Sequence, residues 1–123
     1  MAKNPLVHWE IMGPDARVLA DFYGSVFDWA PEGSPALEDY FQVGDDDSGL
    51  SGAVGQGPAE MPSYLTLYVG VDDVDEQLAK VTAAGGETVM PRTVIPGVVA
   101  FGMFKDPAGN MVGLAENETP AAE

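Results

Sequence analysis

Residues 104–114 read Phe-Lys-Asp-Pro-Ala-Gly-Asn-Met-Val-Gly-Leu, and they define a hairpin from which the rest of the fold can be worked out. Proline comes early and glycine late in Asp106–Asn110, as a tight turn between two strands requires. The residues on either side of this turn are mainly apolar or aromatic. We therefore expect Val98–Phe104 and Met111–Ala115 to be consecutive strands.

Upstream of this hairpin the sequence predicts a strand, a helix and a further strand. Tyr64–Val71 alternates as a strand does. Asp73 and Glu76 have the spacing of a capping box and open a helix that ends at Gly85–Gly86. Glu87–Met90 follows as a short strand. The second half of the chain therefore has the order strand, helix, strand, strand, strand.

The first half of the chain has the same order. Leu6–Met12 is a β-rich run that ends before Gly-Pro, and Asp15 can cap a helix over Ala16–Asp28. Tyr40–Val43 and Leu50–Val54 are expected to be strands. A solvated turn is expected between these two strands.

A nearly constant offset relates the two halves. Thr66 lies 58 positions after His8, and Gly113 lies 61 positions after Gly52. Such an offset indicates an internal duplication. We expect an α+β fold in which two tandem βαβββ modules form a curved half-open barrel with the helices on its convex side.

The expected organisation is a single domain over residues 1–123. Module one spans 5–55, a linker rich in glycine and proline spans 56–62, module two spans 63–116, and the polar tail is 117–123. A chain of this length can bury a sizeable core.

Composition excludes several classes of function. The chain has 20 acidic and 5 basic residues and a formal net charge of −15, which repels phosphate backbones and anionic lipids, so no nucleic-acid or membrane partner is expected. Without cysteine there are no disulfides or thiol nucleophiles. No apolar run has the length of a membrane span, so we expect a soluble, cytoplasmic protein. The acidity either serves solubility or attracts cationic small molecules.

Six segments, taken in this order, carry a resemblance to a known family. They are Val7–Ile11, Phe22–Trp29, Tyr68–Asp75, Ala83–Gly86, Ile95–Val98 and Phe104–Leu114. Together they resemble the glyoxalase/bleomycin-resistance domains of the vicinal oxygen chelate superfamily. The resemblance covers roughly residues 5–116.

The resemblance implies a metal site with one ligand on each of four strands. His8 occupies the first position, and its counterpart in module two is Thr66, a poor ligand. The family's glutamate position falls at Gly113 in module two and near Gly52 in module one. Because such an ion needs three or four protein donors, we expect no metal and no other cofactor. Glu116 lies close to the last position but has the opposite strand parity.

Strand alternation predicts which side chains line the cavity. With His8 and Thr66 facing inward, Leu65, Leu67 and Val69 are expected to pack beneath the helix. The expected ligand-binding residues are Met12, Gln42, Tyr64, Thr66, Tyr68, Met111 and Gly113. An aromatic, methionine-containing pocket with few polar groups suits a small organic molecule.

Two features of the cavity depend on local geometry. We expect Gly113 and Gly52 to leave open space where metal ligands would project. The facing of Phe101 and Met103 stays open, because a bulge near Gly102 would change it.

His8 and Glu10 share a strand face and are the candidate catalytic pair. A carboxylate beside an imidazole raises the pKa of the imidazole and fixes its tautomer, as general acid–base catalysis requires. The same pair equally fits a polar contact that lines a wet cavity or meets a subunit. An improvised metal site in which Gln42 or Tyr68 joins the pair is a further alternative.

The leading interpretation is a small-molecule-binding protein without the family's metal, with an aromatic or cationic ligand. The alternative is a lyase-, isomerase- or hydrolase-like enzyme that uses His8 and Glu10 as acid and base, with or without a recruited divalent metal. A third possibility is a structural module whose concave face is filled by a partner. We also expect a homodimer, because the sheet edges need cover.

Overall fold

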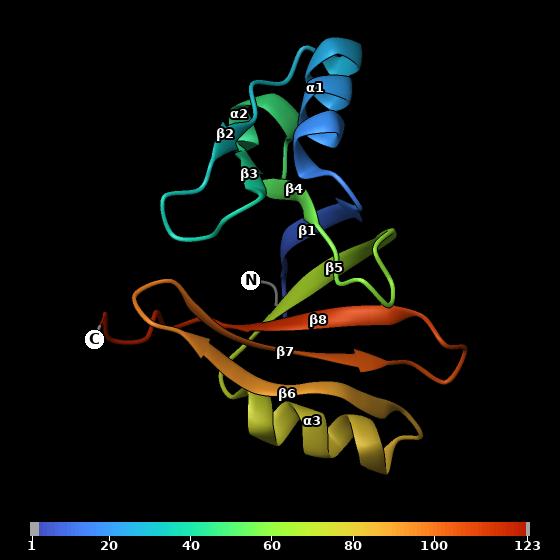
Figure 1. The fold of residues 1–123 in the computed structure, drawn as a ribbon. Helices are drawn as coiled ribbons and strands as arrows, with labels where there is room; N and C mark the ends of the chain where they lie inside the picture. Colours follow the sequence, from blue (N-terminus) through green and yellow to red (C-terminus); the bar gives the residue numbers. More distant parts are fainter. Residues whose placement is uncertain (1–2, 123) are drawn as a thin grey trace. The chain divides into compact units, whose positions relative to one another are not determined.

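The computed structural model describes residues 3–122, which form eight strands and three helices (Figure 1). The elements are β1 (Leu6–Gly13), α1 (Ala16–Phe27), β2 (Glu32–Gly33), β3 (Tyr40–Val43), α2 (Asp45–Ser48), β4 (Gly52–Gln56), β5 (Tyr64–Val71), α3 (Val74–Ala83), β6 (Glu87–Ile95), β7 (Val99–Lys105) and β8 (Met111–Glu116). The predicted α+β class is confirmed. Within residues 3–122 no helix is long and apolar enough to cross a membrane.

The chain divides into two compact units with the same strand topology. One unit is His8–Thr66, in which the strand order is β2-β3-β4-β1, and the other contains β5-β8-β7-β6. The first and last strands of each module pair in parallel, β1 with β4 and β5 with β8, and the other pairs are antiparallel. The predicted duplication of a βαβββ module is thereby confirmed. The predicted single domain and its boundaries stay predictions, and residues 1, 2 and 123 lie outside the described residues.

The predicted helix caps are present. The Asp15 side chain accepts a hydrogen bond from the backbone N–H of Val18 at 3.2 Å, and Asp73 accepts one from Glu76 at 3.0 Å. Each cap occupies one of the N–H groups that the first turn of a helix leaves unpaired. α1 ends one residue earlier than predicted, because Asp28 adopts a left-handed backbone conformation with φ 64°.

The core of the second unit lies between α3 and strands β5 and β8. Val71, Val74, Leu78 and Leu114 are buried together, with Val69 and Phe104 packed against them. The expectation that Leu65 and Leu67 pack beneath the helix is wrong, since their side chains are 70% and 46% exposed. The apolar contacts of α3 are made with the C-terminal half of β5, and these two leucines lie in its N-terminal half.

The hairpin between β7 and β8 is held by one carboxylate. Asp106 accepts hydrogen bonds from the backbone N–H groups of Ala108 and Asn110 and from the Asn110 side chain at 3.0 Å. These hydrogen bonds, chiefly those from Asn110, lower the pKa of Asp106. Gly109 has φ 91°, a conformation that favours glycine. The predicted turn is therefore confirmed, with Asp106 as its organising residue.

β6 is longer than predicted and runs along α3 at the edge of the sheet (Figure 1). The predicted strand ends at Met90, yet pairing with β7 continues to Ile95 through two irregularities in register, between Thr88 and Met90 and between Met90 and Thr93. These irregularities accommodate Pro91, which cannot donate to the strand ladder.

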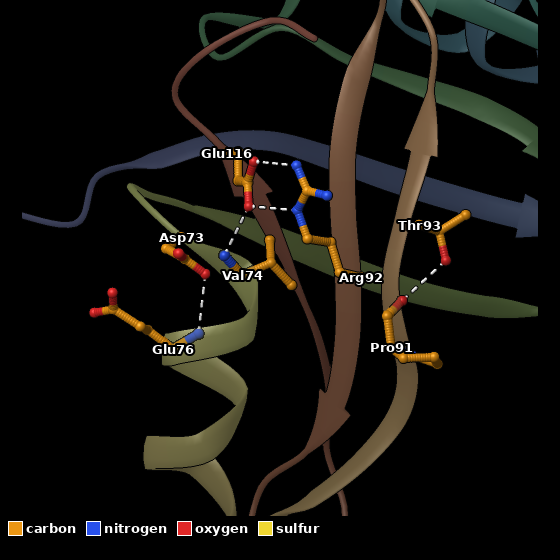
Figure 2. Close-up of polar contacts among 7 residues, drawn as sticks. All are labelled: Asp73, Val74, Glu76, Pro91, Arg92, Thr93 and Glu116. Carbon is orange, nitrogen blue, oxygen red and sulfur yellow. Dashed lines mark hydrogen bonds and ion pairs between the residues drawn. The ribbon is translucent and has the colours of Figure 1, made fainter.

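A bidentate ion pair joins β6 to β8. Nε and Nη2 of Arg92 donate to the two carboxylate oxygens of Glu116 at 2.8 and 2.9 Å, and Glu116 also accepts the backbone N–H of Val74 at 2.9 Å (Figure 2). The hydrogen bonds from Arg92 lower the pKa of Glu116. Glu116 therefore anchors the first turn of α3. This contact agrees with the prediction that Glu116 lies on the opposite strand face from Gly113.

Candidate functional site

Polar side chains gather on one face of the module-one sheet. β1 supplies His8, Glu10 and Met12, whose alternate positions face the same side. In the register of the sheet, Glu10 lies opposite Ala53 of β4, and Ala53 lies opposite Gln42 of β3. The next row consists of Met12, Gly55 and Tyr40. His8, Glu10, Met12 and Gln42 therefore share one face of the sheet, as predicted. The same face carries Tyr40, which was not among the predicted site residues.

Tyr40 connects the two candidate catalytic residues. Its hydroxyl donates to Oε2 of Glu10 at 2.5 Å and lies 2.8 Å from Nε2 of His8. His8 Nε2 and Glu10 Oε2 are themselves 3.9 Å apart, beyond hydrogen-bond distance. Because the one hydroxyl proton goes to Glu10, the Tyr40 oxygen accepts from His8, and Nε2 carries the imidazole proton. The expected direct pair is thus a three-membered chain from His8 through Tyr40 to Glu10.

Small residues on β4 make room for this chain. A Cβ atom at Gly55 would lie 2.8 Å from Cδ1 of Tyr40, a separation that real Cβ atoms essentially never show, and 3.1 Å from Cε of Met12, which is a tight contact. Ala53 is fully buried between the strands that carry Glu10 and Gln42. The sequence Ala-Val-Gly therefore lets the Tyr40 ring reach across β4 toward β1.

Burial controls the charge of the imidazole. Desolvation lowers the pKa of His8, and the nearby Glu10 carboxylate offsets only part of this effect. Glu10 does raise the pKa of His8, as expected, but the net shift is downward because the cost of burying the charged ring is larger. His8 is therefore neutral near pH 7, able to accept a proton at one nitrogen while donating from the other.

Tyr64 belongs to the same electrostatic environment. Burial raises the pKa of Tyr64, and the negative charge of Glu10 adds to this shift. Tyr64 is the first residue of β5 and falls within the unit His8–Thr66. Its phenol stays protonated near neutral pH and can donate a hydrogen bond.

The remaining predicted ligand-binding residues occupy different surroundings. Gln42 is exposed, whereas Thr66 and Tyr68 are buried and Met111 is half-buried. Tyr68, Met111 and Gly113 belong to the second unit, where Tyr68 lies directly opposite Gly113 in the parallel pairing of β5 with β8. Phe101 and Met103 pair with Ala115 and Gly113. These two residues therefore share the face of Gly113.

The glycines at the family's metal positions are covered by aromatic rings. A Cβ atom at Gly113 would overlap the ring of Tyr68, and one at Gly52 would overlap the ring of Trp9. The expectation of open space at these glycines is therefore wrong. Within residues 3–122, no group of three histidine, cysteine, aspartate or glutamate side chains could hold a metal ion. The residues present do not fit the metal site that the fold family implies.

A sequence signal for Tyr40 was available. Tyr40 precedes Gln42 by two residues in a strand that the sequence predicts, so the two side chains share a face. The missing information was the neighbour of that strand. Only the pairing of β3 with β4, and of β4 with β1, brings the tyrosine to Glu10.

Comparison with known proteins agrees with this architecture. Among curated proteins, the anthracycline biosynthesis protein DnrV of Streptomyces peucetius is 30% identical over 118 residues, which covers 82% of this chain and 42% of DnrV. The putative glyoxylase CFP32 of Mycobacterium tuberculosis is 28% identical over 111 residues, covering 85% of this chain and 42% of CFP32. The chain thus spans less than half the length of these relatives.

Solved structures share the fold at low sequence identity. A hypothetical protein, BH1468 from Bacillus halodurans, has a TM-score of 0.70 at 15% identity, covering 99% of this chain and 100% of that protein. Methylmalonyl-CoA epimerase from Mycobacterium tuberculosis has a TM-score of 0.65 at 17% identity, covering 94% of this chain and 87% of the epimerase. The family model described as Glyoxalase/Bleomycin resistance protein/Dioxygenase superfamily matches residues 6–114, and the chain belongs to that superfamily.

Proposed function

We propose that this chain binds a small organic molecule on the face of module one that carries His8, Glu10 and Tyr40, and that binding requires no metal. The observation that carries the proposal is the hydrogen-bonded chain from His8 through Tyr40 to Glu10. A connected, partly buried polar group among aromatic side chains is the usual means of orienting a ligand. The names of the relatives, an anthracycline biosynthesis protein and a putative glyoxylase, also concern small molecules.

The chemical class of ligand follows from charge. Glu10 raises the pKa of Tyr64, so its negative charge acts on this face of the sheet, and the chain as a whole carries −15. A negative field concentrates cations near such a face. We therefore favour a cationic ligand with an aromatic part, which the rings of Tyr40 and Tyr64 would contact.

A thermal-shift screen tests this proposal. Matched sets of aromatic amines, neutral aromatics and aromatic acids are compared on the unmodified chain and on Tyr40→Phe, with Tyr23→Phe as a control for removing a tyrosine hydroxyl elsewhere. We expect stabilisation mainly by the amines, lost in Tyr40→Phe and kept in Tyr23→Phe. Equal stabilisation of both variants would contradict the assignment of the site.

The metal part of the proposal has its own measurement. Protein purified without chelator is analysed for its metal content, and well under one divalent ion per chain is expected, because the family's other ligand positions carry Thr66 and Gly113. One zinc, iron, nickel or manganese ion per chain that disappears in His8→Ala would contradict it.

A second candidate function is proton transfer of the lyase or isomerase type. The neutral imidazole of His8 suits a general base, and Tyr40 fixes its tautomer by accepting from Nε2 while donating its own proton to Glu10. The test is deuterium uptake from heavy water into acidic C–H groups of molecules found in the screen. Uptake that is lost in His8→Ala and kept in Tyr23→Phe supports this function, and binding without uptake leaves the chain as a binding protein.

A further inference from the structure

Helix α1 is apolar on two faces. On its inner face, Ala16 and Ala20 are buried. On its outer face, Val18, Phe22 and Val26 are each more than half exposed. Residues four apart lie on the same side of a helix, so these three form one row, the outer stripe. A stripe of this kind is expected where a helix packs against a second apolar surface.

The equivalent helix of module two lacks such a stripe. α3 buries Val74 and Leu78 against its sheet, as a helix covering one face does. Its exposed positions include Asp75, Glu76 and Lys80, which suit contact with water. The outer stripe is therefore a property of α1 and not of the repeated fold.

Aromatic rings continue from the outer stripe toward the C-terminal end of α1. The ring of Phe22 lies edge-on to Tyr23 with 5.0 Å between centroids, and Tyr23 stacks on Phe27 at 6.0 Å. Phe27 is also more than half exposed and lies 5.2 Å from Trp29. Aromatic side chains are enriched in protein–protein interfaces, and their faces attract lysine and arginine. This surface therefore suits a partner that carries both apolar and basic side chains.

Acidic side chains lie at three places around the outer stripe. Asp15 precedes it at the helix N-cap. Asp21 borders it, because residues three apart are neighbours on a helix and Asp21 follows Val18 by three. Beyond the aromatic end, Asp47 of α2 accepts a hydrogen bond from the backbone N–H of Ala30 at 2.8 Å. The acidic helix α2 therefore lies against the segment that follows α1.

The same part of the chain has little positive charge of its own. Arg17 is the only lysine or arginine between Lys3 and Lys80. Its guanidinium lies 5.0 Å from the centre of the Phe41 ring of β3. A second copy of this chain would bring the same acidic side chains to the outer stripe, and like charges would oppose that contact. A basic partner is the one that complements this surface.

We propose that the outer stripe of α1 is a docking site for a basic amphipathic helix of another protein. The row of Val18, Phe22 and Val26 is a ridge of the kind that packs into the groove of a second helix. The row is about 12 Å long, which matches two turns of such a helix. The apolar face of the partner packs on this ridge, and its lysine and arginine side chains meet Asp15, Asp21 and the aromatic rings.

Fluorescence anisotropy with labelled peptides tests the chemistry of the partner. The probe is a peptide of about four helical turns in which leucines form one face and lysines the other. Its controls are the same pattern with glutamate in place of lysine, and a scrambled peptide of leucine and lysine. We expect the patterned lysine peptide to bind about tenfold tighter or more than either control. Equal affinity for any control would contradict the proposed recognition.

Substitutions locate the bound peptide on the protein. Phe22→Ser should weaken binding of the patterned lysine peptide about tenfold or more, because a central large apolar side chain commonly dominates such an interface. Val18→Ser should weaken it in the same direction. Val94→Ser removes an exposed valine of β6 and should leave the affinity unchanged. Circular dichroism establishes that each variant is folded. Unchanged affinity in folded Val18→Ser and Phe22→Ser would exclude the outer stripe.

A charge reversal separates this surface from the general acidity of the chain. Asp21→Lys should weaken binding of the patterned lysine peptide several-fold, because it places a positive charge beside the lysines of the peptide. Asp75→Lys makes the same change in net charge on α3 and should have a clearly smaller effect. Equal weakening by the two variants would mean that the peptide is attracted by the whole chain, and the proposal would fail.

Self-association is the competing use of the outer stripe. Sedimentation equilibrium is measured on the unmodified chain and on Phe22→Ser, both without peptide. The proposal expects the same mass for the two proteins. A larger mass of the unmodified chain that is lost in Phe22→Ser would assign the outer stripe to a second copy and overturn the proposal.

Discussion

The hydroxyl of Tyr40 reaches Oε2 of Glu10 at 2.5 Å, although β4 lies between the strands that carry the two residues. The ring crosses β4 at Gly55, where a side chain would collide with it. The same hydroxyl lies 2.8 Å from His8, so one tyrosine connects a neutral imidazole to a carboxylate. This crossing joins Tyr40 to two residues of β1 that lie 30 and 32 positions earlier in the sequence, and the three form one polar group.

Gly55→Ala should disrupt this crossing. The added methyl group would contact Cδ1 of Tyr40 and the thioether of Met12, and overpacking of this kind costs about 1–3 kcal/mol of unfolding free energy. Denaturant unfolding measures the cost. Gly44→Ala is the control, because nothing lies within 4 Å of its added Cβ atom. Equal stability of the two variants would mean that Tyr40 does not lie against Gly55.

The titration of His8 should report its burial. Its pKa, followed by NMR of the ring protons, should lie below the usual value of about 6.5. Glu10→Gln should lower the pKa further, since the Glu10 charge acts in the opposite direction to burial. A pKa above the usual value, or an increase in Glu10→Gln, would contradict this electrostatic account.

The lowered pKa of His8 also predicts how stability depends on pH. Because the unfolded chain binds the proton more tightly, His8 destabilises the fold as the pH falls from about 6.5 to its folded-state pKa. His8→Gln should therefore lose less stability than the unmodified chain over this interval. Thermal unfolding of both proteins as a function of pH measures this difference. Identical pH profiles would show that His8 does not contribute to the pH dependence of stability.

Two leucines should differ sharply in their contribution to stability. Leu78 belongs to the buried core beneath α3, and Leu78→Ala should cost about 2–5 kcal/mol by leaving a cavity. Leu67 is 46% exposed, and Leu67→Ala should cost less than about 1.5 kcal/mol. Denaturant unfolding compares them, and a larger cost at Leu67 would contradict the packing of β5.

Glu116 should stabilise the chain in a pH-dependent manner. Its pKa is lowered in the folded state, so its contribution is present above its ordinary pKa and disappears as the pH falls through the lowered value. Glu116→Gln should therefore lower the melting temperature at neutral pH, and the difference should shrink in acid. A difference that stays constant with pH would exclude the ion pair with Arg92 as its cause.

Local signals predicted the parts of the fold that depend on neighbouring residues. The caps at Asp15 and Asp73 and the turn organised by Asp106 each involve groups within four residues, and all three are present. The duplication was visible because both modules keep the same order of elements. The α+β class followed from this order.

Features that depend on contacts between residues distant in the sequence could not be predicted from local patterns. Tyr40 meets Glu10 through two strand pairings that span thirty residues of sequence. Strand alternation correctly placed Leu67 and Thr66 on opposite faces of β5. It does not show, however, how much of β5 is covered by α3. Similarly, the strand was predicted to end at Met90, whereas bulges let β6 continue past Pro91 to Ile95. In each case tertiary pairing decided the outcome.

The most direct test of the account is to locate a bound ligand by nuclear Overhauser effects between ligand protons and the protein. The ligand is the aromatic amine that gives the largest thermal shift in the screen. The account predicts contacts to the ring protons of Tyr40 and to the Met12 methyl group, and their loss in Tyr40→Phe together with most of the affinity. Contacts confined to the exposed rings of α1, such as Phe22 and Phe27, with unchanged affinity in Tyr40→Phe, would contradict it.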